Sequence, residues 1–523
     1  MSALRPRSAR TGGLAAAATL AALTLSAAPA TAVSGPQAPD AVSAATARLD
    51  IGGQRGCSAV LVAPQWLLTA ASCFTDTPGG TLTPGAPKLR TTATLGGTAQ
   101  QVTNLVPRTD RDVVMAQLAK PASGITPIPV ADAAPAAGDE IQAAGFGRTR
   151  EEWVPDQVHA ATFTVQNLNA TTMDLAAKSD GAAICKGDTG GPALTTAGGH
   201  SAVLGVNSLS GQGGCLGTDP AETRTGAVAA RIDDLAGWVQ QIAYGTAFAS
   251  APWKHAVQMT SGYYTGGRPG GSRHMDLIVR WDDGEVTLYQ GGQSNDPAHP
   301  FAAEYRLAAA KSIWAKALAI TGVNTGSGTD GLVVRWIDGE MTQYTTVDAK
   351  GFHGEQQLAP PRTAAWKDDA RLLTASRFIP GGHRDDLLVD WKDGHVSLFA
   401  DLAANGLKKQ TQIVAKNNTW TYADQLTTGS FTGKNTDDLL VRWTDGETTV
   451  YPGLTTGKAL PGEIKIRPAK SNWADATVVT AGAFTTDTTA NDILVRWADG
   501  HLSLFPGADA KGLHDEVRLT PTS

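Results

Sequence analysis

The sequence of 523 residues predicts an all-β protein of two domains in tandem, because a chain of this length exceeds one ordinary domain. Two observations support this prediction. The first half contains short alternating strands between glycine-rich turns, together with all four cysteines. The second half repeats one pattern about every 53 residues and contains ten of the thirteen tryptophans.

Residues 1–32 predict a secretory signal. A basic start (Arg5, Arg7, Arg10) precedes an alanine- and leucine-rich run, and the small residues at 30–32 offer a cleavage site. An uncleaved membrane anchor is the alternative, although a run so rich in alanine is marginal in hydrophobicity for a stable span. We therefore expect a secreted, extracellular protein with no membrane span after signal cleavage.

Charge and cysteine content narrow the classes of partner and cofactor. The net charge is −6 and no block of like charge stands out, so nothing favours a nucleic acid or an anionic membrane surface. Export brings the four cysteines into an oxidising compartment, where they are expected to pair. Other pairings of the four cysteines and a zinc site are the alternatives, but the CxxC or Cys/His spacing that zinc needs is missing. No cofactor or metal is predicted.

Three motifs in the first half carry most of the functional information. Residues 68–73 read Leu-Thr-Ala-Ala-Ser-Cys, residues 111–113 read Arg-Asp-Val, and residues 185–192 read Cys-Lys-Gly-Asp-Thr-Gly-Gly-Pro. They resemble the histidine segment, the aspartate segment and the nucleophile loop of trypsin-like serine proteases. Further landmarks of that family are resembled by 145–149, 203–208 and the helical pattern at 232–242. The resemblance covers about 46–245 and implies a two-barrel β fold for residues 33–245.

The resemblance implies a catalytic triad in which two of three members are changed. Asp112 keeps the acid, whereas Ser72 occupies the histidine position and Thr189 the serine position. An imidazole titrates near neutral pH and can take and return a proton, which an alcohol cannot do. The extra methyl group of Thr189 also restricts its side chain. We therefore predict a serine protease homologue that has lost efficient proteolysis.

The resemblance also implies the other parts of the site. The backbone N–H groups of Gly187 and Thr189 would form an oxyanion hole, and Ala183 and Ser208 would belong to the substrate pocket. An alanine at 183, where a trypsin carries an aspartate, gives no support for specificity toward basic residues. The disulfide pairs that the resemblance implies are Cys57–Cys73 and Cys185–Cys215.

His159, His200 and Lys186 are the alternatives for the missing base. His159 lies in a strand-like run and His200 after a glycine turn, so surface positions are expected for both, and Lys186 is expected at the pocket rim. In the family, Asp188 would anchor a new N-terminus after activation. The sequence lacks the Ile-Val-Gly-Gly start of that segment, so the activation switch is not predicted.

The second half is a repeat that predicts a five-bladed β-propeller over residues 253–523, after a linker at 246–252. A hydrophobic strand ending in tryptophan is followed by Asp-Gly and another strand, which is typical of a hairpin. Five such units with about four strands each suggest the propeller. One tryptophan series is Trp253, Trp314, Trp366, Trp420 and Trp473, and the other is Trp281, Trp336, Trp391, Trp443 and Trp497, spaced 55, 55, 52 and 54 residues.

The chain end predicts how the ring closes. A strand precedes each first-series tryptophan except Trp253, and residues 516–519 supply one spare strand. We predict that this last strand completes the first blade and removes an edge; an open solenoid is the alternative. The repeats resemble tachylectin-like lectins and the FG-GAP-like repeats of secreted bacterial proteins. The calcium loop of the latter is degraded at 265–268, 380–383 and 432–435, so calcium is not expected.

The functional hypothesis is a secreted binding protein. The propeller would bind a glycan or another cell-surface ligand, and the protease-like cleft would hold a peptide or protein. For the repeated tryptophans, packing between blades competes with stacking on sugars. The alternatives are an active serine-type endopeptidase with an unrecognised base, and a structural or adhesive protein without a specific ligand.

Overall fold

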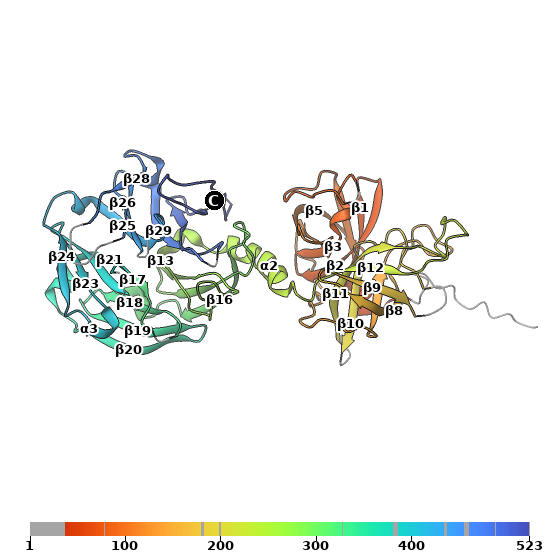
Figure 1. The fold of residues 1–523 in the computed structure, drawn as a ribbon, viewed down its shortest axis with the longest axis horizontal. Helices are drawn as coiled ribbons and strands as arrows, with labels where there is room; N and C mark the ends of the chain where they lie inside the picture. The colour runs from red at the N-terminus through yellow and green to blue at the C-terminus, as the bar shows by residue number, and fades with distance from the viewer. Residues whose placement is uncertain are drawn as a thin grey trace, which may run out of the picture.

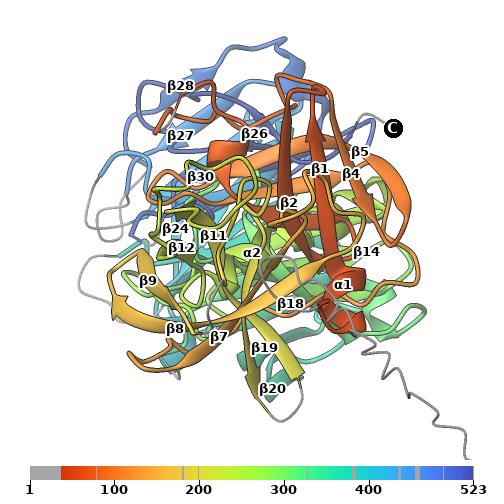
Figure 2. The ribbon, with the colours of Figure 1, turned by 90° about the vertical axis from the view of Figure 1, so that its right-hand side faces the viewer.

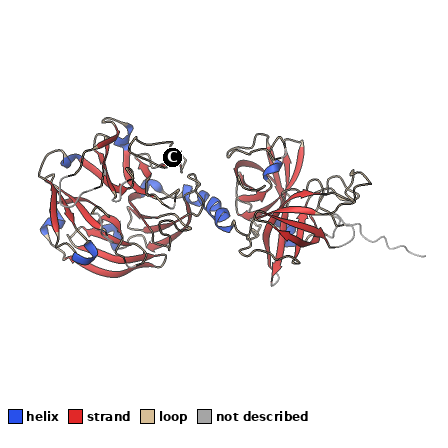
Figure 3. Ribbon diagram, in the orientation of Figure 1, coloured by secondary structure: helices blue, strands red, loops and turns tan. Residues whose placement is uncertain are grey.

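The computed structural model describes residues 37–521 except 78, 179–181, 198–199, 327, 380–384, 434–436, 454–459 and 487. Two closed six-stranded barrels come first, and five four-stranded sheets follow. Figures 1 and 3 show the sheets arranged in a ring and helix α2 (Ala236–Ser250) between the ring and the barrels. The predicted all-β fold, two barrels followed by a five-bladed propeller, is confirmed. The predicted signal at 1–32 lies outside the described residues.

The two barrels form the body that faces the viewer in Figure 2, with the ring behind it. Their strand orders are β1-β2-β3-β6-β5-β4 and β10-β11-β12-β9-β8-β7. Buried and part-exposed residues alternate along strands such as β4, because successive side chains of a strand point to opposite faces. The strands are β1 Thr46–Ile51, β2 Arg55–Ala63, β3 Trp66–Thr69, β4 Thr91–Leu95, β5 Thr98–Pro107, β6 Val114–Leu118, β7 Glu140–Gly145, β8 His159–Leu168, β9 Thr172–Ala177, β10 Pro192–Ala197, β11 His200–Ser210 and β12 Ala227–Arg231, and a short helix α1 Asp40–Ala45 precedes them.

The disulfide pairs predicted from the family resemblance are confirmed. Cys57 is bonded to Cys73 and Cys185 to Cys215. The bridges close loops with sequence separations of 16 and 30 residues. By the chain-entropy model each contributes about 2–4 kcal/mol, mainly by restricting the unfolded chain. Both bridges flank the cleft that is described below.

Helix α2 belongs to both domains. Trp238 and Ile242 lie in the core of the barrels, whereas Phe248 lies in the core of the propeller with Trp253 and Phe301. The ring centroid of Phe248 is 4.8 Å from that of Trp253 and 5.0 Å from that of Phe301. The helix therefore continues through the first part of the segment that was predicted as a linker.

A buried glutamine fixes α2 against the first blade. Gln241 is fully buried, and its side-chain oxygen accepts the N–H groups of Gln293 and Ser294 at 3.0 Å each. Its amide group donates to the carbonyl oxygens of Ser294 and His299. A Cβ at Gly292 would lie 2.4 Å from the Gln241 side chain, so only glycine fits this close approach.

Each propeller blade is one antiparallel sheet of four consecutive strands. No helix among the described residues is long and apolar enough to cross a membrane. The blades are β13 Ala256–Gly262, β14 Asp276–Trp281, β15 Val286–Gly291 and β16 Phe301–Ala308; β17 Ala317–Val323, β18 Gly331–Trp336, β19 Met341–Asp348 and β20 Gly351–Ala359; β21 Ala370–Ser376, β22 Asp386–Trp391, β23 Val396–Phe399 and β24 Gln410–Val414; β25 Ala423–Gly429, β26 Asp438–Trp443, β27 Thr448–Tyr451 and β28 Ile464–Arg467; β29 Ala476–Gly482, β30 Asp492–Trp497, β31 Leu502–Phe505 and β32 Val517–Arg518. Short helical elements accompany them: η2 Trp253–His255, η3 Ile313–Lys316, η4 Ala365–Asp369, α3 Leu402–Asn405, η5 Trp420–Tyr422 and η6 Asn472–Asp475.

The predicted Asp-Gly hairpin turn joins the second and third strands of every blade. The turn glycines have φ between +78° and +94°, a left-handed conformation that glycine adopts without a steric penalty. The positions of these glycines follow the second tryptophan series by three residues. They are Gly284, Gly339, Gly394, Gly446 and Gly500.

The ten tryptophans of the propeller are packing residues. Each is between 1% and 8% exposed. Within every blade the first-series ring lies beside the second-series ring, with centroids 5.2–6.0 Å apart. Only Trp281 and Trp336 line a cavity among those described, and all ten rings are largely covered by protein, so the packing interpretation is favoured for both series over sugar stacking.

The predicted closure of the ring is wrong. The C-terminal strand β32 pairs with β31 in the fifth blade, whereas the outer strand of the first blade is β16. Each outer strand folds back on the strand just before it, and such a connection is shorter than one that would span the ring. The open solenoid is also wrong, because blades one and five share a hydrophobic core and Met275 donates its N–H to the carbonyl oxygen of Ala483 at 2.8 Å.

A repeated polar clamp joins neighbouring blades. Asp330 at the start of the second blade accepts the N–H of Tyr263 in the first blade at 2.7 Å, and its own N–H donates back to the Tyr263 carbonyl oxygen at 3.0 Å. Asp385 forms the same pair of bonds with Asn324 in the second blade. Where blade five meets blade one, Met275 replaces the aspartate. The seam of the ring therefore lacks the carboxylate bond, as does the junction of blades four and five, where Asn491 occupies this position.

Candidate active site

Four of the residues predicted for the site line one cleft of about 680 Å³: Ser72, Gly187, Thr189 and Ser208. Ser72 lies in the short helix η1 (Ala71–Cys73) directly after β3, and Ser208 lies on β11. Gly187 and Thr189 form the turn that precedes β10. Because β3 belongs to the first barrel and β11 to the second, the cleft lies where the barrels meet.

Asp112 lies behind Ser72 and is fully engaged with hydroxyl and amide groups. One carboxylate oxygen accepts the backbone N–H of Ser72 at 2.7 Å. The other accepts the hydroxyl groups of Ser72 at 2.8 Å and of Ser208 at 2.6 Å. The structure thus brings the predicted acid and Ser72 into direct contact, without an intervening ring.

This contact defines what the pair can do chemically. A serine hydroxyl that donates to a carboxylate has no basic nitrogen to offer to a neighbouring nucleophile. Proton transfer near neutral pH needs a group whose pKa lies near that pH. The Ser72–Asp112 pair therefore does not reproduce the base that a hydroxyl nucleophile requires.

Of the three alternative bases, His159, His200 and Lys186, only Lys186 lines the cleft. His159 pairs in strand β8 with Gly145 of β7, and His200 begins β11 at the surface. Neither lines the cleft, and among the described residues that do line it there is no histidine. Lys186 does line it, with an exposed side chain at the rim.

The prediction of an oxyanion hole concerns the backbone N–H groups of Gly187 and Thr189. In the part of the chain that the structure describes, neither Gly187 N–H nor Thr189 N–H donates to another backbone group. Gly187 has φ of +102°, and a Cβ there would lie 2.8 Å from the Cα of Gly147. This turn conformation therefore requires glycine, and it leaves both donors available to a ligand.

Asp188 supports this turn from within the core. It is 1% exposed, and its carboxylate accepts the N–H groups of Gly147 at 2.7 Å and of Cys185 at 2.9 Å. Burial raises the pKa of Asp188 to about 7, against the opposing effect of the two N–H groups. A Cβ at Gly145 or Gly147 would lie 2.3 Å from Asp188, which explains the glycines of the Gly-aromatic-Gly motif.

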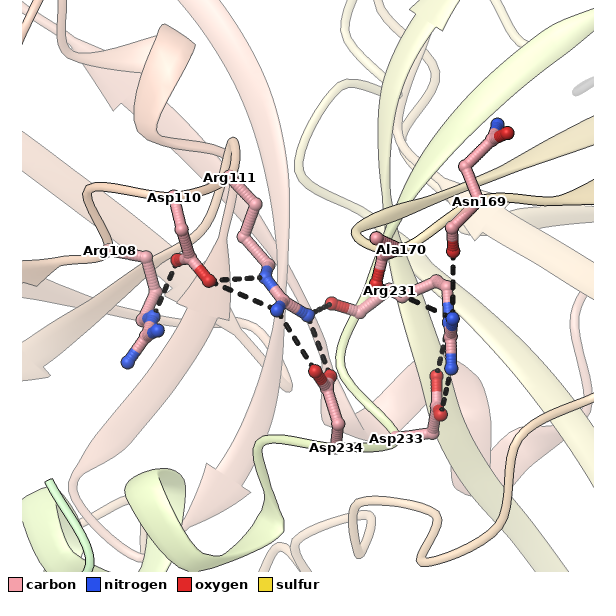
Figure 4. A network of polar contacts seen from close by, with 8 residues as sticks. All are labelled: Arg108, Asp110, Arg111, Asn169, Ala170, Arg231, Asp233 and Asp234. Carbon is pink, nitrogen blue, oxygen red and sulfur yellow. Dashed lines mark hydrogen bonds and ion pairs between the residues drawn. The ribbon is translucent and has the colours of Figure 1, made fainter.

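An arginine beside the acid ties the two barrels together. Arg111 donates to both carboxylate oxygens of Asp234, at 2.6 and 2.9 Å, and to the carbonyl oxygen of Arg231 at 2.9 Å. Figure 4 shows its guanidinium between Asp110 and Asp234. Hydrogen bonds from Arg108 and then Arg111 lower the pKa of Asp110 to about 2. The network fixes the loop that carries Asp112.

The two residues predicted for the substrate pocket, Ala183 and Ser208, lie in different environments. Ser208 lines the cleft and also bonds to Asp112, a contact that the sequence did not reveal. Ala183 is fully buried against the Cys185–Cys215 disulfide and does not line this cleft. Sequence reasoning also missed the cleft walls formed by Arg55, Arg148 and Trp153, because these residues belong to no motif and reach the cleft only through the fold. The lining of the cleft includes all three.

The comparisons with known proteins agree with the fold of the first domain. The family model described as trypsin matches residues 32–239. The chain is also 23% identical over 220 residues to the platelet-aggregating proteinase PA-BJ of Bothrops jararaca, an alignment that covers 38% of this chain and 87% of that protein. At the level of the family, these similarities support a serine protease homologue in the first domain.

Proposed function

From a trypsin-like domain followed by a five-bladed propeller, we propose a secreted binding protein whose cleft holds a polypeptide without cleaving it efficiently. The propeller would be a second binding module, for a glycan or another cell-surface ligand. The observation that carries the proposal is the direct bond from Ser72 to Asp112 at 2.8 Å. It places a non-basic hydroxyl on the acid that would orient a general base.

The members of a catalytic triad contribute to the rate as a unit. Removing the base or the nucleophile alone lowers kcat by roughly a million-fold in a well-studied protease, and losing both adds little. An intact oxyanion hole retains only a weak enhancement over the uncatalysed rate. A cleft that has free backbone N–H groups and lining side chains, but no base beside the nucleophile position, is suited to binding a peptide chain.

Casein turnover by the purified protein tests the loss of chemistry. We expect turnover near background from the natural protein, and turnover from Ser72→His/Thr189→Ser at least about 100-fold above it, the low end of what general base catalysis contributes. Asp112→Asn in the double variant should abolish the gain. Turnover by the natural protein that Thr189→Ala removes would overturn the proposal.

An active serine-type endopeptidase is the second candidate. Two observations favour it: the similarity to a named proteinase and the available amides of Gly187 and Thr189. Thr189 also keeps a hydroxyl at the mouth of the cleft. This function would need a base that the described lining residues do not supply.

The propeller proposal rests on two cavities, each of which is also lined by one largely buried tryptophan, Trp281 or Trp336. A cavity of about 880 Å³ on the first blade is lined by Tyr289, Glu285 and Glu304, among others. One of about 410 Å³ on the second blade is lined by the equivalent Tyr344 and Glu340. Carboxylates accept hydrogen bonds from sugar hydroxyl groups, and repeated weak sites gain strength together.

A glycan array tests this part, and it should use the full chain, because Phe248 of α2 belongs to the propeller core. We expect retention of at least one glycan class, and weaker retention by Glu285→Gln/Glu340→Gln. Asp368→Asn, an exposed change outside both cavities, is the matched control. A folded protein that retains no glycan would favour the structural or adhesive alternative.

A further inference from the structure

The cleft of the trypsin-like domain has a charge opposite to that of the whole chain. Its lining contains four cationic side chains, Arg48, Arg55, Arg148 and Lys186, and one carboxylate, Asp76. The chain as a whole carries a net charge of −6. A cleft lined by one sign of charge focuses the electrostatic potential on its interior.

Carboxylates neutralise this lining only in part, since Arg48 pairs with Asp156, which does not line the cleft, at 3.8 Å. Asp76 is paired with Lys88, which lies outside the cleft, at 2.5 Å. The hydrogen bond from Lys88 lowers the pKa of Asp76, so it stays ionised within that pair. Lys186 carries no ion pair among the described residues and is exposed, so its ammonium group is open to a ligand.

Large apolar side chains lie between these charges. Trp153 is 61% exposed, Val154 67% and Leu209 66%, and all three line the cleft. Apolar groups exposed together beside polar ones mark interaction sites more than isolated exposed residues do. The cleft therefore offers contact area for an apolar side chain as well as for anionic groups.

The Trp153 side of the cleft is held in place before any ligand binds. The guanidinium of Arg148 lies 4.9 Å from the Trp153 ring centroid and donates to the carbonyl oxygen of Leu216 at 2.7 Å. Arg55 donates to the carbonyl oxygens of Cys73 and Thr75. Fixed cations and a fixed ring reduce the ordering entropy that a ligand must overcome.

We infer that the cleft binds an extended segment of a partner protein in which acidic side chains flank a large apolar one. This inference rests on the proposed function and specifies its ligand. The free amides of Gly187 and Thr189 suit a backbone carbonyl oxygen, and the apolar wall suits a side chain such as leucine. Polyanions without apolar groups would leave that wall uncovered.

Fluorescence anisotropy with the full chain and labelled peptides of equal length tests the inference. One peptide alternates glutamate and leucine, a second lysine and leucine, and a third glutamine and leucine. We expect the acidic peptide to bind at least about ten-fold more tightly than the neutral one. Raising the salt from about 0.1 to about 1 M should weaken it, because screening shortens from about 10 to about 3 Å.

Two variants assign the binding to the cleft. Lys186→Glu should weaken the acidic peptide by about five- to ten-fold and spare the neutral one. Leu209→Ala should weaken both peptides equally. Lys120→Glu and Leu168→Ala repeat these changes at exposed positions of the same domain that do not line the cleft, and they should leave all affinities unchanged.

The outcomes distinguish failure of the acidic preference from failure of peptide binding by the cleft. Tighter binding of the neutral or the basic peptide would overturn the acidic preference while leaving peptide binding by the cleft intact. Acidic binding that Lys186→Glu and Lys120→Glu reduce equally would also overturn it. No binding of any peptide by a folded chain would overturn both this inference and the proposed function.

Discussion

Asp390 is a carboxylate in the core of the third blade, at a position where the other four blades carry arginine. It is fully buried. Its nearest cation is Arg371, whose terminal nitrogen lies 3.6 Å from a carboxylate oxygen. Burial raises the pKa of Asp390 to about 7, although Arg371 opposes that shift. The ionised form is therefore poorly solvated in this blade.

The same pair occurs with reversed charge in the fourth blade. There Arg442, on the strand equivalent to that of Asp390, pairs with Asp424. Asp424 and Arg371 both occupy the residue skipped at the bulge of the first strand. Two adjacent blades thus keep one ion pair while exchanging its members, which a search for a fixed Arg-Trp motif does not detect.

Asp390→Asn should stabilise the protein at alkaline pH. Because the folded-state pKa exceeds the ordinary value of 3.8, the stability is greatest below that value and falls as the pH rises toward 7. The variant should remove this fall, gaining roughly 1–3 kcal/mol at pH 8 and almost nothing at pH 4. Thermal melts at both values measure it. Asp368→Asn, an exposed carboxylate in the same blade, is the control, and an equal loss at both values would contradict the argument.

Single residues of the cleft were predictable to different degrees. The motifs identified Ser72 and Thr189, and the structure places both on one cleft. They did not reveal that Ser208, 96 residues from Asp112, donates to the same carboxylate. Such a contact depends on how two barrels meet, and no local pattern encodes that distance. The sequence did not predict the cationic lining of the cleft, for the same reason.

At the scale of elements, α2 is the main difference from the sequence prediction. Its last turns fall in the segment 246–252, which composition alone assigns to a linker. Phe248 nevertheless packs against Tyr289 and Phe301. One aromatic residue in a short connecting segment is a weak signal, because only the fold shows what lies opposite its face.

Phe248→Ala should destabilise the propeller and loosen the join between the domains. Truncating a buried phenylalanine typically costs about 3–5 kcal/mol through lost contacts and a cavity. The loss should appear as a lower melting temperature of the propeller transition and as a broader range of sizes in small-angle scattering. Leu168→Ala, at a residue 38% exposed, should change neither. A propeller that melts unchanged would show that α2 is only a tether.

The ends of the sheets show a second limit of prediction. The strand at 516–519 resembles those that precede each first-series tryptophan, and the repeat alone does not say whether such a strand ends one blade or begins the next. The structure assigns β16 to the first blade and β32 to the fifth. Short connections favour pairing of each outer strand with the strand just before it in the chain. The prediction instead assumed that the last strand would pair with the first blade so that no sheet edge stayed open.

At the scale of the whole molecule, the two-part architecture was predictable because each part has its own strong pattern. Tryptophans at near-constant spacing identified five equal units, and ordered landmarks identified the barrels. What the patterns could not supply is the placement of one part against the other. Gln241 and Phe248 supply it, one through hydrogen bonds to the first blade and the other through its core. These contacts hold helix α2, which also packs in the barrel core, against the first blade.

The continuity of each blade along the chain also affects how the gene can gain or lose a blade. Every blade occupies one uninterrupted stretch of chain, so duplication or loss of about 53 codons in the gene adds or removes a complete sheet. A ring that shared a sheet between its two chain ends would have one split unit that no such event could copy whole. Here the seam at Met275 and Ala483 joins two complete blades side by side, so no blade is divided between the two ends of the chain.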